Sequence, residues 1–247
     1  MEILISEEKG VRQLHFGSQW VQGAMRLSRP DALELQYTRE MMLPLLFNQQ
    51  PWWPRSALFI GLGVGAMPRF LRKHRPQCRI QVVEIEPAVV AAARMHFKLP
   101  PNSDHFDVKL GCGATHMAET SEQFDLIFID GFDENACVGP LNSKEFYGNS
   151  LSRLQEGGWV VANLLSNQKD SAQSIERFQA AFDQKAIILP PCSSGNVIAI
   201  GGRDIPELSN LNELSDLSNK LLEETGLNLS KSVQKLVQAI QLLSKKT

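Results

Sequence analysis

The chain has 247 residues, of which 43% are hydrophobic and 21% are charged, and its formal net charge is −2. This composition is that of an ordinary globular protein, so it excludes global disorder and a fibrous class. The near-neutral charge also argues against a broad nucleic-acid-binding surface. A chain of this length is long enough to form one large α/β domain with a substantial core.

Cysteine spacing and the N-terminal sequence exclude further classes. The four cysteines show no Cys-x-x-Cys spacing and no metal-like pairing with the five histidines, which predicts no metal site and a reducing compartment. The N-terminus lacks the pattern of a signal peptide, and no stretch approaches the ~18 apolar residues needed to cross a bilayer. We therefore expect a cytoplasmic protein with neither a membrane nor a nucleic-acid partner.

Residues 1–50 read as a small N-terminal part. Short apolar and polar stretches alternate over residues 1–30 around three glycines, which is typical of short antiparallel strands. Apolar residues then recur with helical spacing over residues 31–50, and the Pro-Trp-Trp-Pro stretch at 51–54 ends that pattern. The sequence therefore predicts a small β element followed by a linking helix.

Strands and helices alternate over residues 51–203, which predicts an α/β domain with a doubly wound, mainly parallel, seven-stranded sheet. The expected strands are 57–60, 79–85, 106–110, 124–130, 159–165, 185–189 and 196–200. The expected helices are 66–74, 87–96, 143–154 and 171–182. Too few residues separate the last two strands for a crossover helix, so they should pair antiparallel. This arrangement resembles the class I methyltransferase fold, a Rossmann-like fold.

Residues 204–247 form two amphipathic segments that are broken near Gly226, which predicts a helical C-terminal extension. Docking of these helices on the domain is one interpretation. An oligomer interface, as in a homodimer, is the other. The basic run at residues 69–75 is interpreted as a solvated helix face.

A glycine loop, Gly61-Leu62-Gly63-Val64-Gly65, follows an apolar strand and precedes a helix. Glycine permits positive φ and lets a ligand approach the backbone amides and the helix N-terminus. Gly61, Gly63 and Gly65 are therefore the first candidate nucleoside-binding residues. Because the loop also satisfies Gly-x-Gly-x-x-Ala, a dinucleotide site has to be considered.

The next two strand ends add to this candidate site. Glu84 ends the following strand, at the position from which a carboxylate accepts hydrogen bonds from ribose hydroxyls, and we include Ile85 beside it. The segment Gly111-Cys112-Gly113-Ala114 ends a further strand, where glycines favour close approach of a planar group such as adenine. Cys112 and Gly113 are therefore candidate ligand contacts, with an ordinary turn as the alternative.

Asp130 ends an apolar strand and is the candidate catalytic residue. In an open α/β sheet, ligands bind beyond the carboxyl ends of the strands. A carboxylate at that place can hold and orient an amine and accept its proton. Asp133 follows closely, either as a substrate contact or as a cap of the next loop.

The order of these elements resembles the spermidine synthase family of polyamine aminopropyltransferases, in particular its short bacterial spermidine-synthase-like branch. The resemblance runs from Tyr37-Thr38-Arg39-Glu40-Met41-Met42 through Gly157-Gly158-Trp159 to Gly195-Asn196-Val197-Ile198. It implies transfer of an aminopropyl group from decarboxylated S-adenosylmethionine to a small amine such as putrescine. By the same resemblance the glycine loop and Glu84 bind the nucleoside, Asp130 is the catalytic aspartate, and Tyr37 lines the acceptor cavity.

Two departures from the family pattern leave the reaction open. Val64 replaces a family aspartate that grips the aminopropyl ammonium, and a valine cannot pair with a cation. Cys112 replaces a family aspartate that contacts the adenine amine. Three hypotheses remain: an aminopropyltransferase-like enzyme that uses S-adenosylmethionine or its decarboxylated form, a methyltransferase that uses S-adenosylmethionine, and a non-catalytic binder of methylthioadenosine.

Overall fold

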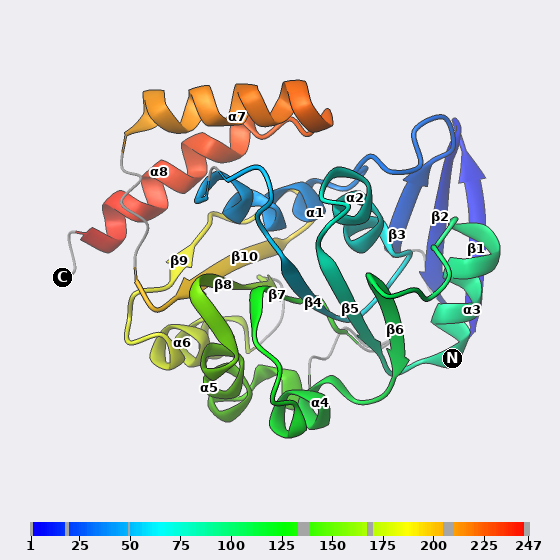
Figure 1. Cartoon of the computed structure of the whole chain (residues 1–247), viewed down its shortest axis with the longest axis horizontal. Helices are drawn as coiled ribbons and strands as arrows, with labels where there is room; N and C mark the ends of the chain where they lie inside the picture. The colour runs from blue at the N-terminus through cyan, green and yellow to red at the C-terminus, as the bar shows by residue number, and fades with distance from the viewer. Residues whose placement is uncertain are drawn as a thin grey trace.

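The N-terminal strands form a separate antiparallel sheet in the computed structural model, which describes residues 2–17, 20–48, 50–132, 139–166, 170–204 and 210–244. The strands β1 (Ile3–Glu8), β2 (Val11–Phe16) and β3 (Val21–Arg26) pair in chain order. Lys9 and Gly10 both have positive φ, as the tight turn of a two-residue hairpin requires. The predicted small β element is confirmed, and it lies at one end of the molecule (Figure 1).

The linking helix is much shorter than predicted. Helix α1 spans only Gln36–Met41, and a 3₁₀ turn, η1 (Leu43–Leu46), follows it. Pro44 ends the α-helix because it has no N–H to continue the hydrogen-bond ladder. The expectation of one helix over residues 31–50 is therefore wrong. A helix of six residues has little stability alone and depends on the surfaces against which it packs.

The large sheet has the strand order β6-β5-β4-β7-β8-β10-β9. Its strands are β4 (Ser56–Ile60), β5 (Arg79–Glu84), β6 (Phe106–Leu110), β7 (Phe124–Ile129), β8 (Leu154–Leu165), β9 (Ile187–Ile188) and β10 (Asn196–Gly202). The first five strands in this order are parallel, whereas β10 is antiparallel to both of its neighbours. The predicted seven-stranded, mainly parallel sheet with an antiparallel last pair is confirmed.

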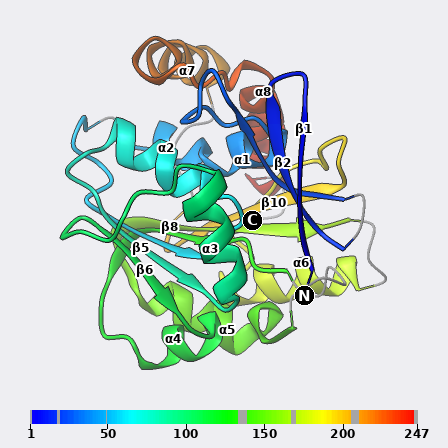
Figure 2. The ribbon, with the colours of Figure 1, turned by 90° about the vertical axis from the view of Figure 1, so that its right-hand side faces the viewer.

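Helices cover both faces of this sheet, and each face has its own hydrophobic core (Figures 1 and 2). Along β4, Ala57 and Phe59 enter one core while Leu58 and Ile60 enter the other, as the alternation of strand side chains requires. The first core includes side chains from α2 (Ala66–His74) and α3 (Pro87–His96). The second includes side chains from α4 (Gly113–Glu119), α5 (Lys144–Ser152) and α6 (Ser171–Ala181).

Helix α4 was not predicted because its sequence carries a weak signal. It begins at a glycine, and only Gly113 and Met117 of its seven residues are buried. Apolar periodicity therefore does not mark it.

The C-terminal extension consists of α7 (Leu211–Thr225) and α8 (Ser230–Ser244), and Gly226 ends α7 in a left-handed conformation. Buried side chains of both helices, among them Leu214 and Leu236, belong to the same core as α1 and η1. Figure 1 shows the two helices lying over α1. The predicted helices are confirmed, while the homodimer and the division into residues 1–50, 51–203 and 204–247 stay predictions. No helix among the described residues is long and apolar enough to span a membrane.

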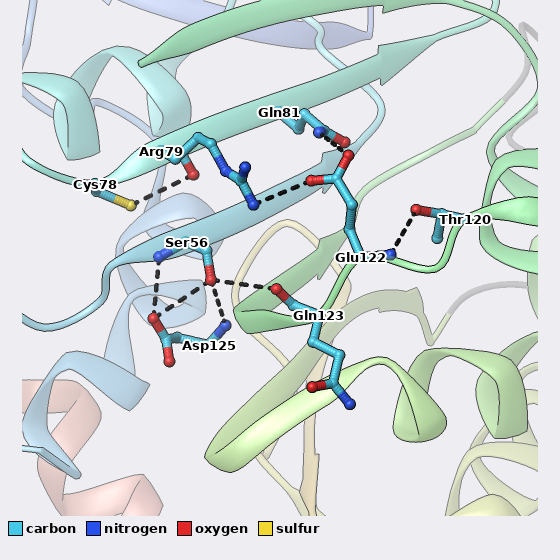
Figure 3. Close-up of polar contacts among 8 residues, drawn as sticks. All are labelled: Ser56, Cys78, Arg79, Gln81, Thr120, Glu122, Gln123 and Asp125. Carbon is cyan, nitrogen blue, oxygen red and sulfur yellow. Dashed lines mark hydrogen bonds and ion pairs between the residues drawn. The ribbon is translucent and has the colours of Figure 1, made fainter. Parts of the chain in front are cut away.

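Polar contacts tie the amino ends of three parallel strands together (Figure 3). The Asp125 Oδ2 atom accepts hydrogen bonds from the backbone amides of Arg55, at 2.7 Å, and Ser56, at 3.0 Å. The Glu122 carboxylate accepts a hydrogen bond from the Gln81 side chain at 2.8 Å and forms an ion pair with Arg79 at 3.1 Å. These contacts hold β4, β5 and β7 in register at the edge opposite to their carboxyl ends.

We predict that Asp125→Ala destabilises the protein by about 1 to 3 kcal/mol, because it leaves two backbone amides at the start of β4 without their acceptor. The measurement is the free energy of unfolding in urea. Asp125→Asn is the control: both amides donate to one carboxylate oxygen, and the amide oxygen of asparagine can still accept both bonds, so its loss of stability should be smaller. Equal stability of the alanine variant and the wild type would contradict the prediction.

Candidate functional site

The glycine loop lies at the carboxyl ends of β4 and β7. Gly61 has a φ of +93°, and a Cβ atom there would come within 2.2 Å of the Asp130 carbonyl oxygen. Gly63 and Gly65 also have positive φ, and Gly65 is the N-cap of α2. Glycine is therefore required at Gly61 for two reasons, the backbone conformation and the lack of space.

A buried arginine, Arg69, is hydrogen-bonded to the backbone of the glycine loop. Arg69 is 4% exposed and donates to the carbonyl oxygens of Val64 at 3.0 Å, Phe97 at 2.7 Å and Pro30 at 2.9 Å. Burial lowers the pKa of Arg69 to about 10. The interpretation of residues 69–75 as a solvated helix face is therefore wrong for Arg69, which connects the loop to two other segments.

Glu84 contacts the glycine loop directly. Its carboxylate accepts hydrogen bonds from the backbone amides of Leu62, at 2.8 Å, and Glu86, at 2.9 Å, one on each oxygen. Burial raises the pKa of Glu84, and these backbone hydrogen bonds oppose the rise. Because a carboxylate oxygen accepts more than one hydrogen bond, Glu84 can hold the loop and still accept hydrogen bonds from a ligand.

The other candidate nucleoside contacts lie at the ends of β5 and β6. Ile85 directly follows β5 and is 63% exposed, and Leu110 ends the neighbouring strand β6 and is 59% exposed. Cys112 is the N-cap of α4, and hydrogen bonds from Thr115, chiefly from its backbone amide, lower the pKa of the thiol. A Cβ atom on Gly113 would come within 2.3 Å of Ile60, so α4 starts tightly against the end of β4.

Asp130 and Tyr37 meet at the end of β7. Burial raises the pKa of the Asp130 carboxyl, and hydrogen bonds from Asn163 and from Tyr37 oppose the rise. The Asn163 Nδ2 atom lies 2.8 Å from Asp130 Oδ1. Burial, followed by the charge of Asp130, raises the pKa of the Tyr37 phenol well above its usual value. Tyr37 therefore stays protonated and serves as a hydrogen-bond donor to the carboxylate.

Asn163 belongs to a polar chain that sequence reasoning missed. The Asn196 Nδ2 atom donates to Asn163 Oδ1 at 2.9 Å, and the Ser194 hydroxyl donates to Asn196 Oδ1 at 2.6 Å. Asn163 and Asn196 are both buried. A polar residue inside the apolar second half of β8, residues 159–165, was the available signal, because a buried amide has to be hydrogen-bonded.

Val64 occupies the space between the glycine loop and the N-terminal sheet. It is 3% exposed, and a Cβ atom on Gly23 of β3 would come within 2.6 Å of the Val64 Cγ1 atom. A cavity of about 20 Å³, enough for roughly one water molecule, lies between β3, α1 and the loop and is lined by Tyr37, Val64 and Asp130, among others. The N-terminal sheet therefore covers the site at Val64, and the cavity beneath it has room for about one water molecule.

Asp133, the predicted substrate contact, lies outside the described residues. Within the described ranges, no group of three or more His, Cys, Asp or Glu side chains is placed to hold a metal ion. The remaining predicted residues gather at one edge of the sheet, at the ends of β4 to β7 and on α1.

We predict that Asn163→Leu raises the pKa of Asp130, because it removes a hydrogen bond that stabilises the charged carboxylate. The Asp130 carboxyl would then lose its proton at a higher pH than in the wild type. The measurement is a pH titration of the ¹³C-labelled aspartate carboxyl signals, with Asp130→Asn assigning the signal. Ser194→Ala, two hydrogen bonds further away, is the control that should shift the pKa less; a fall or no change in Asn163→Leu would refute the assignment.

Comparison with known proteins gives one family for most of the chain. The model of the spermine/spermidine synthase domain matches residues 34–210. The chain is 35% identical to the polyamine aminopropyltransferase of Chromobacterium violaceum, over 97% of this chain and 91% of that protein. The resemblance inferred from the glycine loop, Glu84 and Asp130 is thereby confirmed.

Two solved structures show the same fold. A probable spermidine synthase from Corynebacterium glutamicum superposes with a TM-score of 0.74 at 20% identity, covering 95% of this chain and 90% of that chain. Human methyltransferase-like protein 13, solved in complex with SAH, superposes with a TM-score of 0.63 at 20% identity, covering 86% and 94%. At these identities the comparison concerns the fold alone, and it confirms the predicted methyltransferase-like architecture.

Proposed function

Because the chain belongs to the spermine/spermidine synthase domain family, we propose that it transfers an aminopropyl group from decarboxylated S-adenosylmethionine to a small amine. The observation that carries this proposal is the half-buried Asp130 carboxylate at the end of β7, held by Asn163 and Tyr37 beside the glycine loop. Ligands of open α/β sheets bind at this edge.

The donor nucleoside would lie along the carboxyl edge of the sheet. Gly61, Gly63 and Gly65 leave the backbone accessible, and Glu84 accepts the ribose hydroxyls. Ile85, Cys112 and Gly113 would contact the adenine, where the exposed apolar side chain of Ile85 loses contact with water when a planar ring covers it.

The reaction forms a bond between the amine nitrogen and the carbon next to the sulfonium, and the carbon–sulfur bond breaks. The sulfur takes the bonding electron pair, so the sulfonium charge disappears and methylthioadenosine leaves. The attacking nitrogen loses a proton, which the Asp130 carboxylate accepts. The raised pKa of Asp130 makes it a better proton acceptor than an exposed aspartate, and Tyr37 orients the carboxylate. Asp133 remains the proposed contact to the acceptor.

We expect Asp130→Asn to lower kcat by about a hundredfold or more, because the amide can neither accept the proton nor balance the charge of the amine. Turnover is measured as methylthioadenosine formed from decarboxylated S-adenosylmethionine and putrescine. Nucleoside affinity, measured by calorimetry with methylthioadenosine, should be nearly unchanged because Glu84 and the loop remain. Unchanged turnover in this variant would eliminate Asp130 as the base, and tight NAD binding with no response to the sulfur nucleosides would overturn the donor assignment.

The buried Val64 favours a second candidate, which is methyl transfer from intact S-adenosylmethionine. Position 64 carries a valine and no carboxylate, so it cannot pair with the ammonium of the decarboxylated donor. Intact S-adenosylmethionine carries its own carboxylate, which offsets that ammonium. Methylthioadenosine has no ammonium at all, so the same observation also suits the hypothesis of a non-catalytic nucleoside binder.

Val64→Asp is expected to raise the affinity for decarboxylated S-adenosylmethionine by roughly tenfold relative to methylthioadenosine, because a hydrogen bond between charged groups is worth about 1.5 to 3 kcal/mol. Calorimetry with both ligands gives the ratio of affinities, in which the cost of burying the new carboxylate cancels. Val64→Asn, which has the same shape without the charge, is the matched control. If both variants show the same ratio, position 64 does not face the aminopropyl group.

A further inference from the structure

The C-terminal extension reaches the site through one buried carboxylate. Glu40 on α1 is 1% exposed, and its Oε1 atom accepts hydrogen bonds from Lys235 of α8 at 2.9 Å and from Gln36 at 3.0 Å. Its Oε2 atom lies 3.5 Å from the thiol of Cys192. Lys235 supplies the only cation within ion-pair distance of this carboxylate among the residues that the structure describes.

Lys235 also joins α1 to the turn before β10. Its Nζ atom lies 3.4 Å from the carbonyl oxygen of Pro190, in the same turn that carries Cys192. The ammonium is therefore shared between α1 and this turn. Its side chain is 22% exposed, so the ion pair is partly shielded from solvent.

Helix α1 needs such a support. It has six residues and no side-chain cap at its N-terminus, so its own hydrogen bonds hold it weakly. Tyr37 and Glu40 are three residues apart, which places them on neighbouring positions of the helix surface. A contact that fixes Glu40 therefore also fixes the place from which the Tyr37 hydroxyl reaches Asp130.

We propose that Lys235 is a positioning residue: by pairing with Glu40, the C-terminal extension holds α1 so that the Tyr37 hydroxyl stays hydrogen-bonded to Asp130. The effect on turnover rests on the proposed aminopropyl or methyl transfer, whereas the effect on Tyr37 does not. Loss of the ammonium leaves a buried carboxylate without a cation, and α1 moves to hydrate it.

The test uses the two tyrosines of the chain, Tyr37 and Tyr147. With tyrosine labelled at ¹³Cζ, the full-length protein gives two signals, and Tyr37→Phe assigns them. Lys235→Met is expected to shift the Tyr37 signal and to leave Tyr147, which donates to Asn142, in place. Lys231→Met, an exposed lysine of the same helix, is the matched control and should shift neither signal. Lys235→Arg, which keeps the charge, should retain most of the wild-type position.

Turnover gives the second measurement. We expect kcat to fall by about tenfold to a hundredfold in Lys235→Met, while methylthioadenosine affinity changes little, because a displaced orienting group affects the reaction more than the nucleoside. If Lys235→Met fails to fold, Lys235→Gln is used instead; this polar variant also leaves the Glu40 carboxylate without a cation, so a displaced Tyr37 signal is still expected. A wild-type Tyr37 signal in every foldable variant lacking the ammonium would overturn the proposal. Absence of turnover in the wild type would overturn the proposed function and leave the spectroscopic test intact.

Discussion

The site depends on the close approach of two strand ends. The backbone at Gly61 and the backbone at Asp130 lie so near each other that no side chain fits between them. The same hydrogen bonds that pair β4 with β7 thus bring a ligand-binding loop and a carboxylate to one edge of the sheet. Polar contacts of Asp125 and Glu122 hold the opposite edge, so the register that creates this approach is fixed from both ends.

Three carboxylates, two of them buried and one half-buried, then decide which parts of the chain assemble around that edge. Glu84 accepts a hydrogen bond from a backbone amide of the glycine loop, and Asp130 accepts hydrogen bonds from the side chains of Asn163 and Tyr37. Glu40 accepts one from the ammonium of Lys235. A buried charge is costly unless its partners are in place. Each carboxylate therefore stabilises the arrangement that supplies its donors, and the donors come from the loop, the sheet and the C-terminal extension.

Val64, in contrast to these carboxylates, places no charge beside the site. Its methyl groups fill the space under Gly23, so the N-terminal sheet closes over an apolar surface where the family pattern has an aspartate. The family relation and the position of Asp130 favour the proposed group transfer to an amine, whereas Val64 offers a cationic donor no partner for its charge.

Sequence periodicity was enough to predict the order of the strands and of the helices other than α4, the parallel sheet with its antiparallel last pair, and the candidate residues at the strand ends. These features depend on local patterns of apolar residues and glycines, which each segment carries by itself. The shortness of α1 was also encoded locally, by Pro44, but the apolar spacing concealed it. Only the tertiary structure decided which distant segments meet. It placed Asn163 against Asp130 and Lys235 against Glu40, and it buried Arg69. Such partners share no spacing in the chain, because the packing of separate elements brings them together.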